Sequence, residues 1–255
     1  FSAVTIWIGK ETAYISFRGT DSTLIGWKEN LNMCFLTPVP AQDAAAAYVS
    51  ALHGANGCNL RLGGHSKGGN LAMYAAAFCA EPAQAKITGV DNCDGPGFDA
   101  EVLEQGPYQF IQQKIRTFIP QGSIVGMLLN HGEPPTVVNS RNKGVHQHNI
   151  YSWDVDATTF TRAEALSRDS VLLDKTIKDW ISGIYRQRRG QFIDALYEVL
   201  AATNVETLHD LDSEWYHHGE AMLKKLSELD APTQELIKKT ASALYQAIKK
   251  NVFAR

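Results

Sequence analysis

Short apolar segments alternate with glycine-rich turns over about the first 155 residues, and this alternation limits the possible folds more than any other feature. Five runs have the composition of strands: residues 3–8, 13–17, 60–62, 87–90 and 115–119. The first two are separated by a short turn and predict a hairpin, whereas the alanine-rich segment 70–80 has the composition of a buried helix. Strands and helices therefore alternate, which predicts an α/β fold with a mainly parallel sheet flanked by helices.

After about residue 155 the pattern changes to apolar residues at helical spacing. Such stripes occur within residues 172–184, 192–200 and 237–252, with Gly190 and the turn 230–232 between them, and they are typical of helices that bury one face. We therefore expect an α/β core over residues 1–155 and a C-terminal helical extension over residues 156–255 that packs on or caps this core. The sequence opens directly on a strand without an initiator methionine, so we expect the N-terminal part of the core to be missing.

Composition and charge argue against several functional classes. A net charge of -3 gives no basic surface for nucleic acid, and no apolar run reaches the roughly 18 residues that span a bilayer. The 4 cysteines lie far apart without a C-x-x-C pair, so we predict neither a metal site nor an organic cofactor. Buried free thiols fit a reducing compartment, and we expect a cytoplasmic protein unless a secretion signal has been removed upstream.

The stretch RLGGHSKGGN, residues 61–70, contains the pattern G-x-S-x-G with Ser66 at its centre. The pattern alone is not specific, because three small residues at fixed offsets often recur by chance. Its context is more specific, since a strand precedes it and a helix follows it, as in a nucleophile elbow. Gly64 and Gly68 would let the strand and the helix approach closely, and Ser66 is predicted to be a nucleophile at a helix N-terminus.

A serine nucleophile that attacks a carbonyl group needs hydrogen-bond donors for the oxyanion. The backbone N–H of Lys67, the residue after the nucleophile, is the first expected donor. A second donor should come from a loop that follows an earlier strand. The stretch FRGTD, residues 17–21, ends the second strand, and we predict that Thr20 donates through its backbone N–H and its hydroxyl.

Histidine is the usual general base for a serine nucleophile. In α/β-hydrolases the nucleophile comes first in the chain, followed by the acid and then the histidine, which excludes His53 and His65. Of the remaining histidines that precede the helical region, His131 lies earlier, whereas His146 and His148 share a loop after the last strand-like run. Both histidines of this loop are candidates.

The acid is less well determined by sequence. Asp91 and Asp94 lie in VDNCDGPGF, at the end of the strand that follows the nucleophile helix. Ser123 ends the next strand, where many hydrolases carry their acid, and a serine cannot stabilise an imidazolium ion as a carboxylate does. We therefore predict Asp94, with Asp91 as the alternative and Asp154 or Asp156 as candidates beyond the histidine.

Several motifs occur together in a fixed order: FRGTD, GWKEN, GHSKGGNLA, DGPGF, SIVGMLL and QHNIYSW. Together they resemble a bacterial family of lipase-like α/β-hydrolases of unknown physiological role, distantly related to the class 3 lipases. The resemblance is close over about the first 155 residues and looser in the helical tail. It implies an α/β-hydrolase fold for this chain.

The resemblance also matches residues to roles. Ser66 matches the lipase nucleophile, His148 the lipase histidine and Thr20 the Thr or Ser of the oxyanion strand. The acid of class 3 lipases would fall at Ser123, so this sequence departs from their pattern. Pancreatic-type lipases carry an aspartate one strand earlier, which supports an acid within the segment that holds Asp91 and Asp94.

The leading expectation is therefore a serine hydrolase that cleaves carboxylic esters, including small-molecule or lipid esters, through an acyl-enzyme. One alternative is a non-catalytic binding or scaffold protein on a degenerate hydrolase fold, motivated by the missing acid at Ser123. Another is an acyltransferase or thioesterase that uses the same triad. The apolar segment 127–129 and the prolines 134–135 are expected to shape an acyl pocket or a lid.

Overall fold

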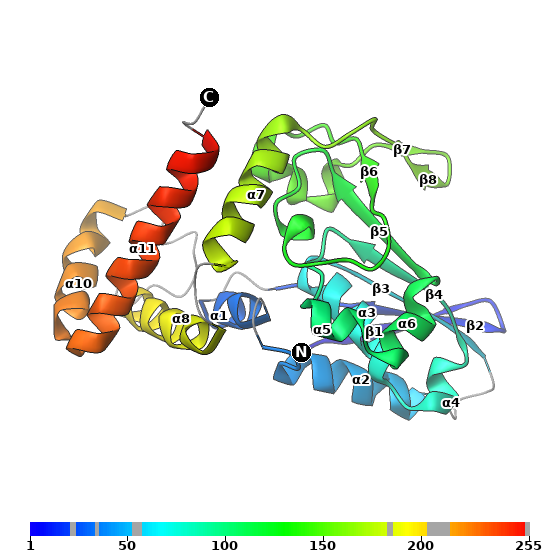
Figure 1. Cartoon of the computed structure of the whole chain (residues 1–255). Coiled ribbons are helices and arrows are strands. Elements are labelled where there is room, and N and C mark those ends of the chain that lie inside the picture. The colour runs from blue at the N-terminus through cyan, green and yellow to red at the C-terminus, as the bar shows by residue number, and fades with distance from the viewer. Residues whose placement is uncertain (21–23, 34–35, 53–57, 183–185, 203–214, 253–255) are drawn as a thin grey trace. The chain divides into compact units, whose positions relative to one another are not determined.

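The structure is a computed structural model of the chain (Figure 1), and it describes residues 1–20, 24–33, 36–52, 58–182, 186–202 and 215–252. Contacts within the chain divide it into two compact units. The first unit comprises Phe1–Gly19 and Thr37–Asp174, and the second comprises Thr20–Leu36 and Lys175–Arg255. The first unit thus continues past residue 155, and the second includes a segment from near the start of the sequence.

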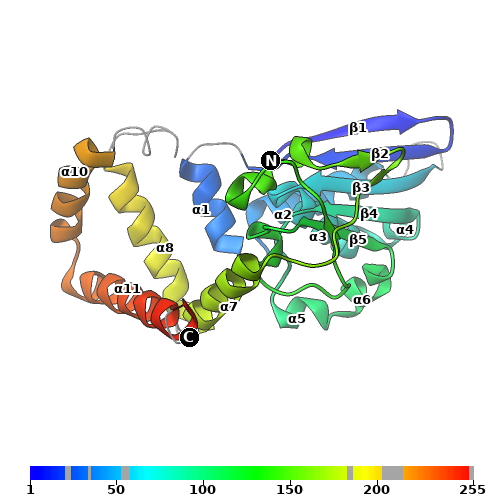
Figure 2. The same cartoon turned by 90° about the horizontal axis from the view of Figure 1, so that it is seen from above.

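Six strands of the first unit form one sheet in the order β1-β2-β3-β4-β5-β6 (Figure 1), and Figure 2 shows β1 to β5 of this sheet from above. They are β1 (Ala3–Ile8), β2 (Thr12–Phe17), β3 (Asn59–His65), β4 (Ile87–Cys93), β5 (Ile115–Pro120) and β6 (Thr136–Val138). β1 and β2 pair antiparallel, and every later pair in this sheet is parallel. The predicted hairpin and mainly parallel sheet are confirmed. The sequence analysis missed β6, because three residues are too few to show a period.

Helix α3 (Lys67–Phe78) lies in the middle of the hydrophobic core. It contacts β2, β3 and β4 and packs against α2 (Pro40–Leu52). Almost all of its residues are buried, which the alanine-rich sequence permits because small side chains let a helix lie close to a sheet. On β2, Ala13, Ile15 and Phe17 enter the same core and alternate with half-buried residues, so one face of the strand is covered.

Shorter elements complete the first unit. They are α4 (Glu81–Gln84), α5 (Ala100–Leu103), α6 (Gly106–Gln112), η1 (Val125–Met127), η2 (Gly144–His148), η3 (Ile150–Ser152), β7 (Val155–Asp156) and β8 (Thr159–Phe160). The last two strands form a separate small sheet. The predicted acid Asp94 lies in the loop after β4, and the predicted histidine His148 ends the turn η2.

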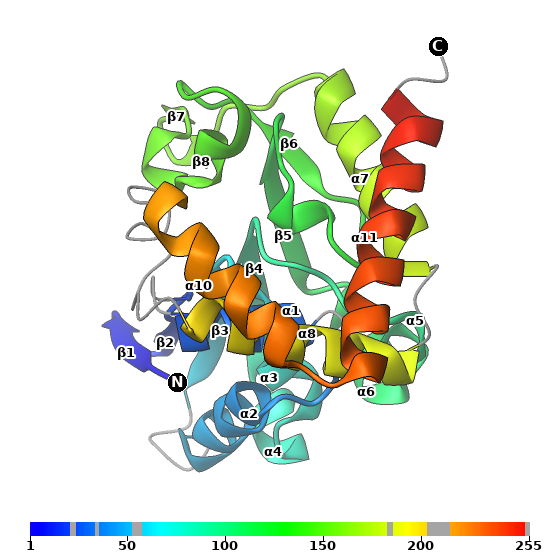
Figure 3. The same cartoon turned by 90° about the vertical axis from the view of Figure 1, so that its left-hand side faces the viewer.

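Helices make up the described part of the second unit, as the C-terminal sequence pattern predicts. Its helices are α1 (Leu24–Met33), α8 (Arg186–Ala201), α10 (Trp215–Glu228) and α11 (Ala231–Val252), while α7 (Arg168–Ser182) begins in the first unit and ends in the second. α8 contacts α1, α10 and α11 (Figure 3). Gly190 lies inside α8 and does not end a helix, contrary to its predicted place between helices. Among the described residues, no helix is long and apolar enough to cross a membrane.

Candidate active site

Ser66 occupies a sharp turn between β3 and α3. Its backbone has φ 58° and ψ -129°, a combination that residues other than glycine rarely adopt. Its N–H donates to the Cys93 carbonyl group at 2.9 Å, and its own carbonyl group accepts from the Gly69 N–H at 2.9 Å. The turn is therefore held by the neighbouring strand and by the helix, with the serine at the point where strand and helix meet.

The two glycines of G-x-S-x-G are required because neither position has room for a side chain. A Cβ atom on Gly64 would overlap the backbone of Gly68, and a Cβ atom on Gly68 would overlap the carbonyl oxygen of Phe17. β2, β3 and α3 thus approach more closely than any side chain permits. Gly19 approaches the same turn from the end of β2, since a Cβ atom there would lie 3.7 Å from the Cβ atom of Ser66.

Asp94 follows β4, and its carboxylate is fully buried and hydrogen-bonded at both oxygens. Oδ2 lies 2.6 Å from Nδ1 of His148, and Oδ1 accepts from the Ser123 hydroxyl at 2.5 Å and from the Gly126 N–H at 3.1 Å. Because an ionised carboxylate only accepts, this contact places a proton on Nδ1 of His148. Nε2 of His148 is then the nitrogen with the free lone pair.

The turn η2, which carries His148, is fastened by several hydrogen bonds. The His148 carbonyl group lies 2.6 Å from Nε2 of His65. The Gln147 carbonyl group accepts from the Trp153 indole at 2.8 Å, and its side chain accepts from the Gly122 N–H at 3.0 Å. The rings of His65 and His148 lie 4.5 Å apart. Burial, followed by the charge of His148, lowers the pKa of His65, which favours the neutral form of that ring.

These contacts bring His148 next to the residue that precedes Ser66. Within the described part of the chain, the Ser66 hydroxyl itself makes no hydrogen bond, and the residue is 9% exposed. The His148 side chain is 32% exposed, so the histidine is reachable from solvent, whereas Asp94 is not. Hydrogen bonds between catalytic groups are often long without substrate and tighten when it binds.

The predicted oxyanion donors lie on either side of the elbow in the sequence. Lys67 is the first residue of α3, where backbone N–H groups point out of the helix N-terminus. Thr20 directly follows Gly19 and is the first residue of the second unit. Its hydroxyl is buried without a hydrogen-bond partner among the described residues. A buried polar group without a hydrogen-bond partner destabilises the fold, and such groups are often found where a ligand supplies the partner.

The Mbeg1-like family model matches residues 1–198 of the chain. The chain belongs to the Mbeg1-like family. The matched span contains Ser66, Asp94 and His148, and it ends within α8. No curated protein matches the sequence.

The other acid candidates of this Mbeg1-like chain lie elsewhere. The Asp91 carboxylate is 3.0 Å from the Arg61 guanidinium group and 2.5 Å from that of Arg116, and among the described residues it contacts no histidine. Asp154 pairs loosely with a surface arginine, and Asp156 is exposed on β7. The structure therefore brings only Asp94, among the described aspartates, to His148.

The supporting roles of Ser123, Gly126 and His65 in the Mbeg1-like chain are not predicted by the sequence. The sequence predicts only that Ser123 takes the place of the usual acid, whereas in the structure its hydroxyl donates to the Asp94 carboxylate. The sign of these roles in the sequence is the stretch SIVG after β5, in which Ser123 carries a hydroxyl group and Gly126 has no side chain. His65 was excluded as the base by chain order, and it instead contacts the backbone of His148.

A cavity of about 480 Å³ lies beside His148 in the Mbeg1-like structure. Its lining residues are His65, Asn142, His146, His148, Asn149, Ile150 and Tyr151. Cavities of this size accommodate small organic groups. The predicted apolar segment 127–129 does not line it, and Pro134 lines a different cavity of about 720 Å³ next to Glu133. His146, the alternative base, is exposed on the rim of the smaller cavity.

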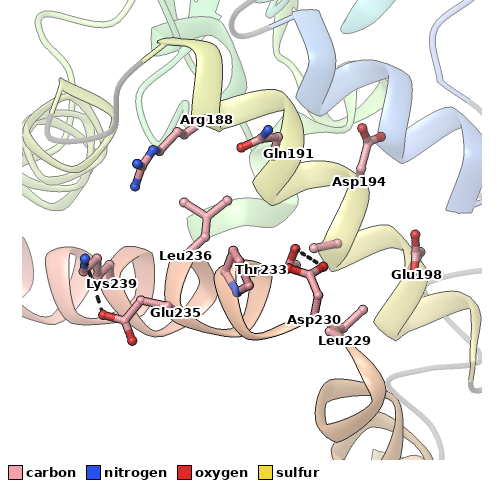
Figure 4. A pocket seen from close by; sticks show the side chains of 12 residues that line it. Arg188, Gln191, Asp194, Glu198, Leu229, Asp230, Thr233, Glu235, Leu236 and Lys239 are labelled. Atoms are coloured by element: carbon pink, nitrogen blue, oxygen red, sulfur yellow. Dashed lines mark hydrogen bonds and ion pairs between the residues drawn. The ribbon is translucent and has the colours of Figure 1, made fainter.

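A further cavity of about 620 Å³ lies in the second unit, where residues of α8 face residues of α11 (Figure 4). Four of its side chains bind one another in pairs: Lys239 lies 3.4 Å from Glu235, and the Thr233 hydroxyl donates to Asp230 at 2.7 Å. Its lining residues include no serine, cysteine or histidine. The candidate active site of the Mbeg1-like chain is therefore the elbow at Ser66.

Two cysteines, Cys93 and Cys79, are the other candidate nucleophiles among the described residues. Burial, followed by the charges of Asp91 and Asp94, raises the pKa of the Cys93 thiol to about 12, and burial raises that of Cys79 to about 11. Both thiols are therefore protonated at neutral pH and poorly nucleophilic. No group of three or more His, Cys, Asp or Glu side chains that could hold a metal ion occurs among the described residues.

Proposed function

We propose that this Mbeg1-like protein is a serine hydrolase that cleaves carboxylic esters through an acyl-enzyme, and that its first unit is an α/β-hydrolase fold. The observation that carries the proposal is the 2.6 Å contact between the buried Asp94 carboxylate and Nδ1 of His148. This contact orients a general base beside the turn that holds Ser66. The strained φ and ψ of Ser66 and the motif resemblance to lipase-like hydrolases also support the proposal.

In the first half of the proposed reaction, the Ser66 hydroxyl attacks the ester carbonyl carbon. Nε2 of His148 accepts the hydroxyl proton, and the resulting imidazolium ion is stabilised by Asp94. The carbonyl π electrons move onto oxygen to give the tetrahedral oxyanion. When this intermediate collapses, the bond to the alcohol oxygen breaks, and His148 returns its proton to the departing alcohol. The acyl group is then covalently bound to Ser66.

In the second half, water takes the place of the alcohol. His148 accepts a proton from the water molecule while the water oxygen attacks the acyl carbon. The second tetrahedral intermediate releases the carboxylic acid as the bond to Ser66 breaks, and His148 returns the proton to the serine oxygen. No external oxidant, reductant or cofactor is needed for these steps.

Backbone and side-chain donors would stabilise both oxyanions. The N–H of Lys67 is one proposed donor, because it follows the nucleophile at the start of α3. The hydroxyl and N–H of Thr20 are the other, and the buried hydroxyl without a partner among the described residues is the observation in their favour. An oxyanion would provide the acceptor that this hydroxyl lacks.

The proposal is tested by turnover of p-nitrophenyl esters of graded acyl length. We expect the wild-type protein to hydrolyse the short esters, given the modest size of the cavity beside His148. Ser66→Ala should abolish turnover, and Ser227→Ala, a change at an exposed serine of α10, should retain it. Folded protein that hydrolyses neither esters nor thioesters, and transfers no acyl group to added alcohols or amines, would favour the non-catalytic alternative.

A further inference from the structure

A second histidine–carboxylate pair lies behind Asp94, between η1 and the start of β6. Nε2 of His131 is 2.9 Å from the Gly126 carbonyl oxygen, and Nδ1 is 3.6 Å from Oε1 of Glu133. The side chains are nearly buried, at 10% exposure for His131 and 8% for Glu133. Because a carbonyl oxygen only accepts, Nε2 carries a proton, and Nδ1 faces the carboxylate.

Gly126 connects this pair to the proposed triad acid. Its carbonyl group accepts from His131, and its N–H donates to Oδ1 of Asp94 at 3.1 Å. The backbone lies directly against the carboxylate, since a Cβ atom on Gly126 would overlap Oδ1 of Asp94 and the side chain of Ile119. A small displacement of Gly126 would therefore change one of the donors that orient Asp94.

Glu133 is itself anchored on regular elements of the fold. Its carboxylate accepts from the Thr117 hydroxyl on β5 and from the Tyr108 hydroxyl on α6, the latter at 3.2 Å. Burial by itself would raise the pKa of Glu133, but the nearby His131 ring and the hydrogen bond from the Thr117 hydroxyl outweigh it and lower the pKa. The carboxylate is therefore ionised at neutral pH, and it faces Nδ1 of His131 at 3.6 Å from a position anchored on β5 and α6.

We infer that His131 is a positioning residue for the proposed hydrolase: it holds Gly126 so that the Gly126 N–H keeps the Asp94 carboxylate aligned with Nδ1 of His148. This inference rests on the proposed function. Glu133 orients the His131 ring in turn. His131 does not contact substrate in this scheme, and its effect reaches the reaction only through Gly126 and Asp94. Outer partners of this kind set the orientation of the groups that react.

Two substitutions separate the lost hydrogen bond from lost packing. His131→Gln retains an N–H donor near the position of Nε2, whereas His131→Leu fills a similar volume without any donor. Val49→Ala, a core change in α2 outside this network, serves as a control for lower stability. Two properties are measured in each protein: the rate at which a fluorophosphonate labels Ser66, and the downfield proton resonance of the His148 Nδ1–H that is bonded to Asp94.

We expect His131→Leu to slow labelling by about 10- to 100-fold, the usual effect of removing an outer partner, and to shift or broaden the resonance. His131→Gln and Val49→Ala should stay close to wild type in both measurements. The inference is overturned if His131→Leu leaves both unchanged, or if all three variants lose labelling in proportion to their loss of stability.

A further variant covers the case in which His131→Leu does not fold. Glu133→Gln keeps the shape of the network and removes the charge that holds His131, so it should shift the resonance in the same direction; no shift would contradict the inference. If the wild-type protein is not labelled at all, the proposed function fails. The response of the resonance to the variants at His131 and Glu133 still tests the positioning of Asp94.

Discussion

Asp94 and His148 are 54 residues apart in the sequence, and their side chains meet at 2.6 Å. Asp94 follows β4, the strand next to β3, which leads into Ser66. Parallel strands place their carboxyl ends at one edge of a sheet, where sites of α/β proteins usually form. The turn η2 brings His148 to this edge, and the contact with His65 holds it there. The geometry thus joins a histidine and an aspartate at the edge that carries Ser66.

Replacement of the two candidate acids should have very different effects. Asp94→Asn should lower esterase activity by about three to four orders of magnitude, because the amide cannot hold the histidine tautomer or stabilise the imidazolium ion. Asp91→Asn should change activity less than about threefold, since Asp91 binds only arginines among the described residues and does not contact His148. Initial rates with a short p-nitrophenyl ester compare the two, and a larger loss in Asp91→Asn would contradict the assignment.

The strain in the Ser66 backbone should appear as a difference in thermal stability between two variants of this residue. With φ at 58°, a glycine adopts the native conformation without a Cβ penalty, whereas an alanine retains the penalty. We expect Ser66→Gly to be more stable than Ser66→Ala by about 1 kcal/mol, and its Tm to be higher by about 2–4 °C. Thermal unfolding followed by circular dichroism compares the two inactive variants. Equal Tm values, or a more stable alanine variant, would show that the turn is not strained.

The close approach of strand and helix at the elbow predicts a site that cannot accept a methyl group. Gly64→Ala would overlap the backbone of Gly68 and should cost about 1–3 kcal/mol of unfolding free energy, as overpacked positions do. Gly106→Ala, where nothing lies within 4 Å of the added Cβ atom, is the matched control and should be neutral or slightly stabilising. Urea unfolding measures both variants. A fully stable Gly64→Ala protein would mean that the elbow is looser than described.

The parts of the fold that follow from local patterns could be predicted from sequence. The hairpin, the parallel strands and the buried helix α3 each have a clear composition and period, and they are present in the structure. The pairing of Asp94 with His148 was one of several pairings that chain order allowed.

The rest depends on contacts between distant segments, which no local pattern reports. The helix α1 belongs to the second unit although it lies between strands in the sequence, and the network through His131 and Glu133 joins loops to β5 and α6. Ser123 was recognisable as a residue that cannot serve as the acid. Its hydrogen bond to Asp94 required the three-dimensional arrangement of two adjacent strand ends.

Glu133 should make the stability of the fold depend on acid. Burial raises its pKa, but the nearby His131 ring and the hydrogen bond from the Thr117 hydroxyl outweigh this and leave the pKa below its ordinary value. A carboxyl group with a lowered pKa stabilises the fold above the unfolded pKa, and this stabilisation is lost as pH falls through the folded value. Urea unfolding of wild type and Glu133→Gln should therefore show a difference that shrinks from about pH 6 to about pH 3. A difference that stays constant or grows as pH falls would contradict an ionised Glu133.

The central claim is that Ser66 is a nucleophile activated by His148 and Asp94. Intact-protein and peptide mass spectrometry after incubation with a fluorophosphonate tests it most directly. We predict a single adduct on Ser66 in the wild-type protein, none in Ser66→Ala, and much slower labelling in Asp94→Asn than in Asp91→Asn. Folded wild-type protein without an adduct, or an adduct on another residue that persists in Ser66→Ala, would contradict the claim.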